Sequence, residues 1–359
     1  MRRKVLILHA YSAANLGDGL LVSESIAAVR EAFGADAAIT VCASYPASFD
    51  IPDVKFVDAK PNRTGYRREY IRMLFRVNSF DVLIGVGGGY LRAGSFLEAT
   101  KVLLVHGPQL LTAVISKKSV AYLPQSVGPL RGGSGPLIRA ILRRAKVVYL
   151  RDDRSMQELD IANAVRTSDM AILTADVSST RDSNTAPDVV PVLSVRPIGG
   201  EVPPLVQSLA HSLKKFDGYV QSDAGANRDR TTMVELGPRA ILSQVELLGH
   251  GPDGERRVVV AVRLHAALMA LRAGHLVIHL AYERKGFGAF QDLGLQEYVH
   301  NVNMFEPARV QEQVRTLVES VDARSRYDAA VVQTFTEASV SYRALIKTLS
   351  CLATDCERG

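Results

Sequence analysis

The sequence predicts an α/β fold made of two Rossmann-like domains that face each other across a cleft. Short β-branched runs alternate with amphipathic helical patterns over most of the chain, which is typical of parallel sheets covered by helices. A polar, turn-rich segment near the middle separates two such series. At 359 residues, the chain is also longer than one hydrophobic core usually organises. These observations favour two domains over one.

The first series occupies residues 1–177, which form the predicted N-terminal domain. β-branched and apolar runs predict strands at residues 5–8, 38–42, 55–58, 82–86, 119–123, 147–150 and 171–173. Apolar positions at helical spacing predict helices at residues 20–32, 66–77, 96–104, 110–115 and 135–144.

The second series follows a predicted linker at residues 178–188. Within the predicted C-terminal domain, residues 189–324, strands are expected at 189–195, 218–221, 258–262 and 276–280. Helices are expected in the same domain at 205–216, 265–273 and 310–318. The last segment, 325–359, is predicted to be a long closing helix with a short tail.

The composition is that of a globular protein, with 47% hydrophobic and 22% charged residues. No apolar run reaches the roughly 18 residues that would span a bilayer, and the apolar stretch at 5–8 is too short for a signal peptide. The three cysteines, Cys42, Cys351 and Cys356, imply no disulfide framework. We therefore expect a cytoplasmic protein, either free or at the inner face of the membrane.

The net charge of +6 is concentrated in two basic stretches. Residues 60–76 hold six Lys and Arg residues against Glu69, and residues 131–154 hold seven against two aspartates. Such stretches favour anionic partners, and they lack the interleaved aromatic residues typical of nucleic-acid binding. In segment 66–77, arginines flank a Tyr/Met/Leu stripe, which suggests peripheral contact with an anionic membrane. The alternative is that this stripe packs on its own domain.

Polar and glycine residues follow several strands of the first domain, where parallel sheets usually bind ligands. The candidate binding residues there are Asn15, Gly17, Asp18, Gly88, Gly89, Gln125, Ser126 and Arg151. The glycines at 87–89 would let backbone N–H groups approach a ligand, but the triplet is not the GxGxxG pattern of a dinucleotide fold. Asp18 is equally well explained as a helix N-cap.

The clearest candidate site follows the apolar strand predicted at 258–262. Arg263 and His265 stand where this strand ends and a helix begins, and Lys285 follows the next strand. Helix N-termini attract anions, arginine binds carboxylate or phosphate through two N–H groups, and histidine can transfer a proton near neutral pH. A histidine at a helix start is often only structural, but the neighbouring cations favour a site. The remaining histidines and cysteines predict neither a metal site nor a resident cofactor.

Eight short motifs together resemble the polysaccharide pyruvyl transferase family. They run in order along the chain: NLGD at 15–18, GGG at 87–89, QSVGPL at 125–130, LRDDRS at 150–155, SDMA at 168–171, VQSD at 220–223, RLHA at 263–266 and AYERK at 281–285. Where the family usually has a proline after Gly274, this chain has His275. The resemblance extends from about residue 5 to about residue 293.

The resemblance implies a fold similar to that of B-type glycosyltransferases and transfer of pyruvate from phosphoenolpyruvate to a sugar, free or lipid-linked, to form a ketal. It also implies His265 as general acid and Arg151, Arg263 and Lys285 as substrate contacts. Because Arg151 and Arg263 stand at strand ends in different domains, we predict that phosphoenolpyruvate is held between the two halves, and nothing in the reaction requires a metal. One alternative is a B-type glycosyltransferase that uses a nucleotide sugar. Against it, no carboxylate follows His265 until Glu283. A binding module without catalysis is a further alternative, which the retained Arg151, Arg263 and His265 disfavour.

Overall fold

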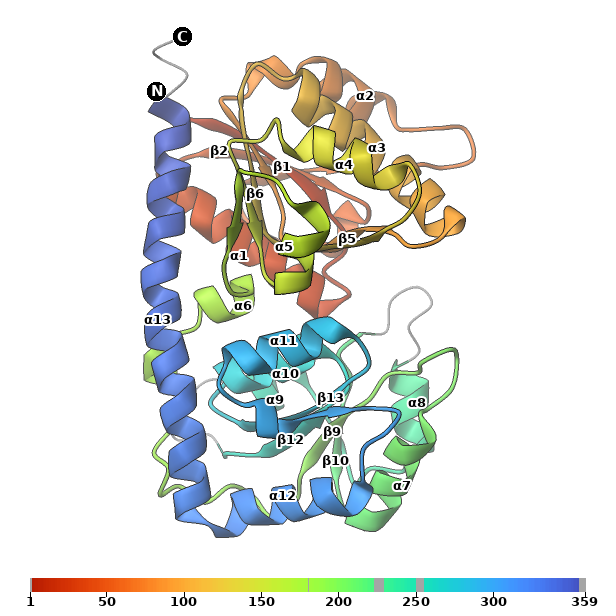
Figure 1. Cartoon of the computed structure of the whole chain (residues 1–359), viewed down its shortest axis with the longest axis vertical. Helices are drawn as coiled ribbons and strands as arrows, with labels where there is room; N and C mark the ends of the chain where they lie inside the picture. The colour runs from red at the N-terminus through yellow and green to blue at the C-terminus, as the bar shows by residue number, and fades with distance from the viewer. Residues whose placement is uncertain (1, 180, 223–228, 250–254, 355–359) are drawn as a thin grey trace. The chain divides into compact units, whose positions relative to one another are not determined.

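The computed structural model describes residues 2–179, 181–222, 229–249 and 255–354, and the chain divides into two compact units (Figure 1). The first unit contains residues 1–13, 18–170 and 340–359, and the second contains residues 14–17 and 171–339. Thr180 of the predicted linker, Asp223 of the VQSD motif and Cys356 lie outside the described residues.

The first unit is built on an eight-stranded sheet whose strand pairs are parallel. Its strands are β1 (Lys4–Ala10), β2 (Ala38–Ala43), β3 (Val54–Asp58), β4 (Val82–Gly85), β5 (Gly88–Ala93), β6 (Ser119–Leu130), β7 (Val147–Leu150) and β8 (Ala164–Arg166). Their spatial order is β3-β2-β1-β4-β6-β7-β8, and β5 pairs with the second half of β6.

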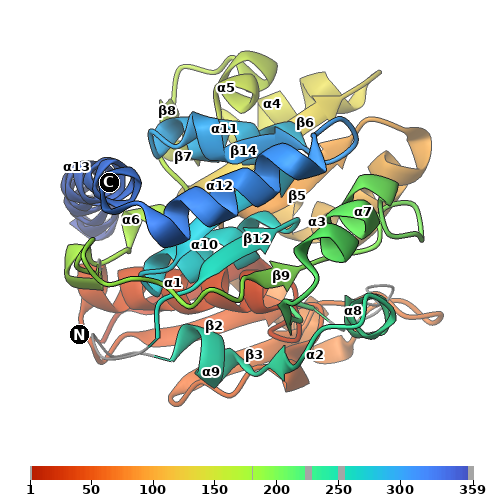
Figure 2. The same cartoon turned by 90° about the horizontal axis from the view of Figure 1, so that it is seen from below.

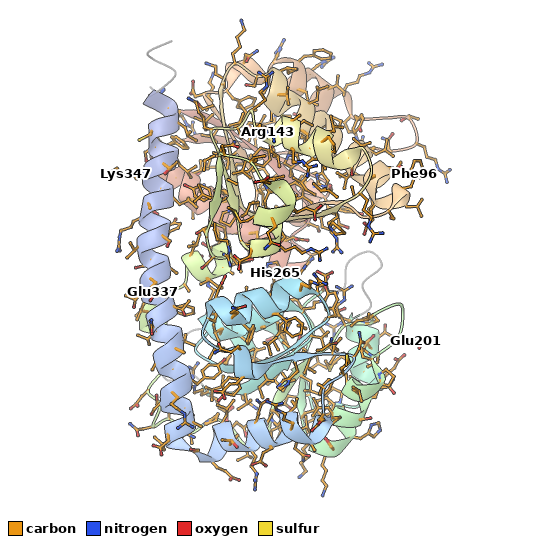
Figure 3. The ribbon with its side chains drawn as sticks, in the orientation of Figure 1. Phe96, Arg143, Glu201, His265, Glu337 and Lys347 are labelled. Atoms are coloured by element: carbon orange, nitrogen blue, oxygen red, sulfur yellow. The ribbon has the colours of Figure 1, made fainter. Side chains whose placement is uncertain are left out.

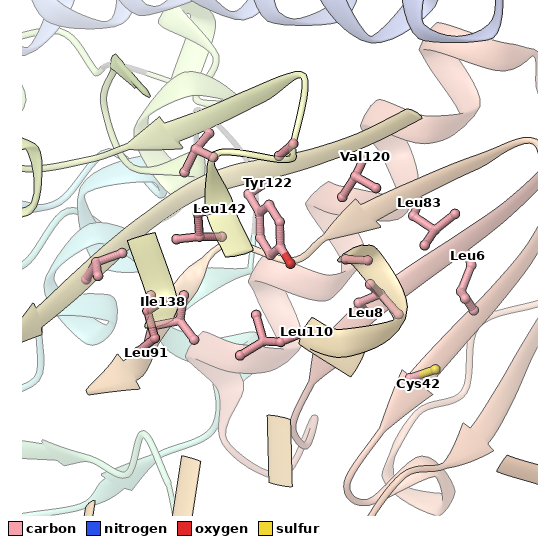
Figure 4. Packing of buried hydrophobic residues seen from close by; sticks show 14 of the residues in the cluster. Leu6, Leu8, Cys42, Leu83, Leu91, Leu110, Val120, Tyr122, Ile138 and Leu142 are labelled. Carbon is pink, nitrogen blue, oxygen red and sulfur yellow. The ribbon is translucent and has the colours of Figure 1, made fainter. Parts of the chain in front are cut away.

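Helices cover this sheet and bury its apolar strands. They are α1 (Leu16–Phe33), α2 (Arg68–Phe75), α3 (Phe96–Ile115), α4 (Ser134–Leu142) and α5 (Asp153–Leu159). Alternate residues of the strands, such as Leu6 and Leu8 of β1, pack with Leu110 of α3 and Ile138 of α4 in one cluster around Tyr122 (Figure 4). The core of the first unit therefore fixes β1, β6, α3 and α4 against one another.

The second unit repeats the same plan on a six-stranded parallel sheet. Its strands are β9 (Val192–Ser194), β10 (Asp217–Tyr219), β11 (Ile241–Leu242), β12 (Val258–Ala261), β13 (Leu276–Ala281) and β14 (Val299–Asn301). Its helices are α7 (Pro204–Leu213), α8 (Asp229–Glu235), α9 (Gln244–Leu248), α10 (Leu264–Arg272), α11 (Arg284–Asp292) and α12 (Pro307–Glu319), and Figure 2 shows α12 beside α7. The short α6 (Met170–Leu173) joins the two units.

Both sheets have the strand order of a doubly wound Rossmann fold. The second runs β11-β10-β9-β12-β13-β14, so the chain winds outward from β9 to one edge and then outward from β12 to the other. In the first sheet the same reversal lies between β1 and β4. Ligands of such sheets bind beyond the carboxyl ends of the strands at this reversal point. The predicted α/β class with two Rossmann-like sheets is confirmed.

Several elements predicted for residues 1–177 were wrong in kind or extent. Residues 124–129, expected as a loop, continue the long strand β6, and residues 171–173, expected as a strand, belong to helix α6. The helices expected at 96–104 and 110–115 are one helix, α3, which accommodates Pro108. The pairing of β6 with β7 shifts register between Tyr122 and Gln125, and such irregularities are where a sheet accommodates a residue like Pro124.

Segment 66–77 packs on its own domain, which is the alternative that we gave to membrane contact. Tyr70 and Val77 are buried in the first unit's core, and Met73 and Leu74 lie against it. The four arginines that flank the stripe, Arg67, Arg68, Arg72 and Arg76, are exposed. The stripe itself is therefore part of the domain core.

The long C-terminal helix α13 (Val321–Thr354) contributes residues to both units. In the second unit, Asp328 of this helix accepts two hydrogen bonds from the buried guanidinium of Arg256, at 2.5 and 3.1 Å. In the first unit, Tyr342 donates a hydrogen bond to Glu31 of α1, and Ser350 donates one to the carbonyl of Ala32. Among the described residues, no helix combines the length and hydropathy needed to cross a lipid bilayer.

Two buried histidines of the second unit make stability depend on pH. Burial lowers the pKa of His275 and of His279 to about 4, because the charged imidazolium would lose its hydration. A histidine in the unfolded chain takes up its proton near pH 6.5. Stability is therefore fully present above that pH and should fall on acidification, by roughly 1–2 kcal/mol per histidine between pH 6.5 and 5. Thermal unfolding of the full chain across this range measures the loss.

The same measurement on His279→Gln provides the control. The variant should be less stable at every pH, because His279 Nδ1 loses its 2.8 Å contact with the carbonyl of Ala261. Its loss of stability on acidification should nevertheless be smaller than that of the unaltered chain. An identical pH dependence in both proteins would contradict this account.

Candidate functional site

The candidate site of the second unit lies at the reversal point of its sheet. Arg263 is the N-cap residue of α10, directly after β12, and His265 stands in the first turn of that helix (Figure 3). The neighbouring strand β9 ends at Ser194, and Ala261 of β12 pairs with it. A guanidinium and an imidazole thus lie at the start of a helix, where the first backbone N–H groups have no partner within the helix and the helix dipole favours negative charge.

His265 packs directly on Gly17. A β-carbon placed on Gly17 would lie 2.6 Å from Nδ1 and 2.7 Å from Cβ of His265, which is closer than real side chains approach. Gly17 belongs to segment 14–17, which is part of the second unit, where Asn15 also forms an antiparallel bridge with Ser222. The NLGD motif therefore holds the imidazole of His265 in place, and its glycine is required by this packing.

Arg263 forms a buried, two-pronged ion pair with Asp229, the first residue of α8. Nε donates to one carboxylate oxygen at 2.5 Å and Nη2 donates to the other at 2.8 Å. Burial raises the pKa of the Asp229 carboxyl, and the hydrogen bonds from Arg263 act in the opposite direction. Arg263 is only 9% exposed. Because the ion pair holds the buried guanidinium in one orientation, it also fixes the direction in which the remaining N–H groups of Arg263 point.

Two further cations lie at the carboxyl ends of strands in the same unit. Lys285, in the first turn of α11, forms a 2.8 Å ion pair with Glu283, and both side chains are half-buried. Arg196 follows β9 and donates to the hydroxyl of Tyr282 at 2.7 Å, with its guanidinium 4.8 Å from the ring centroid. Its charge also lowers the pKa of Asp229, although less than Arg263 does.

In the first unit, Arg151 is buried at the end of β7 within a polar network. Its Nε donates to the hydroxyl of Ser126 at 2.9 Å, and its Nη1 donates to the buried carboxylate of Asp169. Ser126 in turn donates to Asp152 at 2.6 Å. The motifs QSVGPL, LRDDRS and SDMA, which are separate in sequence, therefore meet through these side chains.

The glycine triplet and Gln125 border this network. A β-carbon on Gly87 would lie 2.4 Å from the carbonyl oxygen of Pro124, so Gly87 is needed for strand packing. Gly88 adopts φ +152, and a β-carbon on Gly89 would lie 3.7 Å from Nη2 of Arg151. Gln125 is fully buried in β6, where Gly88 pairs with it. Gln125 accepts a hydrogen bond at its carbonyl from the N–H of Arg151 at 3.1 Å, so Gly89 and Gln125 both lie beside this arginine.

The other predicted residue of the first unit, Asp18, lies in the first turn of α1. There its charge favours the helix start, but Asp18 is not the N-cap residue that the alternative explanation proposed, because α1 already begins at Leu16. His275, the departure from the family pattern, is buried: Nδ1 accepts from the N–H of Arg257 at 3.1 Å, and Nε2 lies 2.5 Å from the carbonyl of Leu247. It serves the packing of β13.

Sequence reasoning missed a buried cluster at the carboxyl end of β1. His9 adopts φ +70, its N–H donates to the side chain of Gln109 at 2.7 Å, and its Nδ1 lies 3.2 Å from that of His106. Tyr90 stacks on His9 with ring centroids 4.7 Å apart. Burial lowers the pKa of His106 to about 4 and also lowers that of His9.

Two other missed residues belong to the second unit. Arg196 could have been found, because it follows a predicted strand as Arg263 does. Asp229 could not have been found from the sequence, since only the fold brings it to Arg263. Among the described residues, no group of three or more His, Cys, Asp or Glu side chains is placed to hold a metal ion.

Comparisons with solved structures place the fold among the B-type glycosyltransferases. A UDP-glucosyltransferase from Polygonum tinctorium aligns with a TM-score of 0.55 and 11% identity, over 99% of each chain. A putative UDP-N-acetylglucosamine 2-epimerase from Listeria monocytogenes aligns with a TM-score of 0.54 and 9% identity, over 92% of this chain and 91% of the other. At such identities the likeness concerns the fold alone.

Comparison at the level of sequence identifies the family. No curated protein sequence matches this chain significantly. The family model described as polysaccharide pyruvyl transferase matches residues 15–235, which is more than half of the chain and includes six of the eight motifs. The chain therefore belongs to the polysaccharide pyruvyl transferase family.

Proposed function

We propose that this protein transfers the pyruvyl group of phosphoenolpyruvate to a sugar, free or lipid-linked, and closes a cyclic ketal on it. The observation that carries the proposal is His265 in the first turn of α10, two residues after the ion-paired Arg263 and packed on Gly17. Family membership supplies the reaction class, a transferase that acts on polysaccharide. The donor and the acceptor are the proposed parts.

The chemistry of phosphoenolpyruvate matches these residues. The reaction begins with a proton delivered to C3, which converts the enol carbon C2 into an oxocarbenium-like electrophile, and His265 can supply that proton. One sugar hydroxyl then bonds to C2, the C–O bond to phosphate breaks, and a second hydroxyl closes the ketal. One hydroxyl proton replaces the proton given to C3, and the other leaves with phosphate.

The cations supply the electrostatic part of catalysis. Phosphoenolpyruvate carries a carboxylate and a phosphate, and Arg263, Arg196 and Lys285 stand at strand ends of the unit that holds His265. Arg151 occupies the equivalent kind of position in the first unit. Because buried partners fix Arg151 and Arg263 before substrate arrives, they can stabilise developing negative charge with little reorganisation.

A glycosyltransferase that uses a nucleotide sugar is the second candidate, because proteins of that activity share the fold. Phosphate release from phosphoenolpyruvate with a panel of sugar acceptors, beside nucleoside diphosphate release from nucleotide sugars, distinguishes the two. Acceptor-dependent phosphate release supports the proposal. Release of nucleoside diphosphate without release of phosphate from phosphoenolpyruvate would contradict the proposal and support the glycosyltransferase.

Replacing His265 by Ala should lower turnover by roughly 100- to 10,000-fold, because general acid catalysis contributes about that much. The affinity for phosphoenolpyruvate should change far less than kcat. Steady-state kinetics measure both, and circular dichroism verifies the fold. His211→Ala, which alters an exposed histidine of α7, is the matched control and should retain activity. An unfolded His265 variant would assign this residue a structural role instead.

Gly17→Ala tests how His265 is positioned. The added β-carbon must displace the imidazole, and a displacement of about 1 Å can cost roughly 100-fold in rate. Gly133→Ala adds the same atom at a glycine with nothing within 4 Å and φ −69, so it should leave kcat unchanged. If the Gly17 variant kept full turnover, the packing between Gly17 and His265 would have no part in catalysis.

The buried pair of Arg263 and Asp229 requires a double variant. Arg263→Gln alone should destabilise the protein by about 3–5 kcal/mol, because Asp229 is left buried without its partner. Adding Asp229→Asn removes the uncompensated charge and should restore much of that stability. If Arg263 contacts phosphoenolpyruvate, the double variant should still bind it roughly 10- to 100-fold more weakly, the value of one charge-assisted contact.

Titration of the folded double variant with phosphoenolpyruvate, followed by calorimetry, measures that affinity. Binding equal to that of the unaltered protein would show that Arg263 serves only to hold Asp229 and the start of α8.

A further inference from the structure

Helix α3 departs from the pattern of an ordinary surface helix. Its inward residues Val102, Leu110 and Ala113 are buried, as expected of a helix that covers a sheet. Most of its exposed residues are apolar as well, with Phe96 85% and Leu97 79% exposed, and Lys101 is the charged residue among them. A helix with apolar residues on its inward and outward faces is normally buried on both. The outer face of α3 therefore indicates a partner that covers it.

The outward apolar residues of α3 lie along one side of the helix, where the exposed Lys101 stands between Leu97 and Leu104. Leu97, Leu104, Leu111 and Ile115 are all exposed and are spaced by seven, seven and four residues, which places them on one side of the helix. Phe96 and Leu103 stand beside this stripe, toward α4. Exposed apolar surface of this extent on a soluble protein is typical of an interaction site.

A cavity of about 710 Å³ opens next to the stripe, between α3 and α4. Its walls are mainly apolar and include Phe96, Leu103, Leu110, Leu137 and Ile141, all from the first unit. This volume lies within the range of about 300–1,000 Å³ that accommodates small ligands. An apolar cavity beside an apolar stripe suits a hydrocarbon chain.

Basic residues border parts of this apolar surface. Between Arg92 and Lys146 the sequence holds nine Lys and Arg residues and a single acid, Glu98. Glu98 is engaged locally, since its carboxylate accepts from the N–H of Gly94 at 2.9 Å. Arg131 lines the cavity, and Arg143 and Arg144 are exposed just after α4. Helix α2, which also contacts α3, carries the exposed Arg68 and Arg72.

We propose that the α3/α4 face of the first unit docks on an acidic lipid bilayer, with the cavity holding one hydrocarbon chain. Charge complementarity selects this occupant: the surface pairs exposed apolar side chains with a rim of cations, as an interfacial protein surface does. A nucleic acid would satisfy the cations but leave the apolar stripe in water. The proposal is independent of the donor substrate and of the catalytic residues.

Vesicle sedimentation of the full chain tests the proposal. Vesicles with 40 mol% phosphatidylglycerol in phosphatidylcholine should bind the protein at low salt, on the order of ten-fold or more tightly than pure phosphatidylcholine vesicles, since each nearby cation adds roughly five-fold. The triple variant Phe96→Ser/Leu97→Ser/Leu104→Ser should bind at least ten-fold more weakly. So should Arg131→Gln/Arg143→Gln/Arg144→Gln, which leaves the apolar residues intact.

A matched control separates this surface from exposed apolar residues in general. Val245 and Met304, in the second unit, are 78% and 79% exposed, and Val245→Ser/Met304→Ser should bind vesicles like the unaltered protein. Leu111→Ser/Ile115→Ser provides an independent test of the stripe should the triple variant fail to fold. Circular dichroism verifies each variant.

Three outcomes would overturn the proposal. The first is no binding of the unaltered protein to acidic vesicles, and the second is equal binding to neutral vesicles. The third is undiminished binding by folded stripe variants. If sedimentation equilibrium instead shows a dimer that the stripe variants abolish, while vesicles are not bound, the surface is an interface between copies of this chain.

Discussion

A guanidinium that is taken out of water needs a carboxylate partner, and this requirement shapes both units. Arg151 pairs with Asp169, Arg263 with Asp229 and Arg256 with Asp328, each buried. In each pair one residue stands at or near a strand and the other comes from a distant segment. Because removing either partner of such a pair costs about 3–5 kcal/mol, the pairs hold loops and helix starts in defined places. The cations proposed to bind substrate are thus also structural, and their charge is presented from fixed positions.

The packing of Gly17 on His265 adds a steric constraint to this electrostatic one. The first motif of the chain and the seventh are nearly 250 residues apart, yet the second unit brings them into contact. A glycine at position 17 leaves the imidazole the space that a β-carbon would occupy. Preorganisation of a proton donor by neighbours that do not themselves react is an economical way to fix its geometry.

The alternation of strands and helices could be predicted from the sequence, because buried parallel strands form short apolar runs that stand out between polar segments. The strand-end positions of Arg151, Arg263 and His265 followed from the same pattern. Their partners could not be predicted, since Asp169 and Asp229 are brought in by tertiary structure alone. The errors lie at prolines: β6 continues beyond the strand predicted at 119–123 through Pro124 and Pro129, and α3 continues through Pro108 between the two helices predicted there. The assignment of catalytic and substrate-binding roles remains a prediction.

The two units also differ in what they expose. The second unit holds the histidine proposed as proton donor and three of the proposed anion-binding cations, whereas the first carries the apolar stripe of α3 with its basic rim. The cations of the two units differ in burial, so each set can serve a different purpose. In the second unit, the ion pair with Asp229 fixes the guanidinium of Arg263 at the reversal point of the sheet, where its remaining N–H groups can meet a bound anion. In the first unit, Arg131, Arg143 and Arg144 are exposed and face water, where their charge is screened by salt and can be used only against a surface of opposite sign. A transferase that acts on a glycan precursor in or near a membrane would need both kinds of charge, one fixed and buried for chemistry and one exposed for attachment.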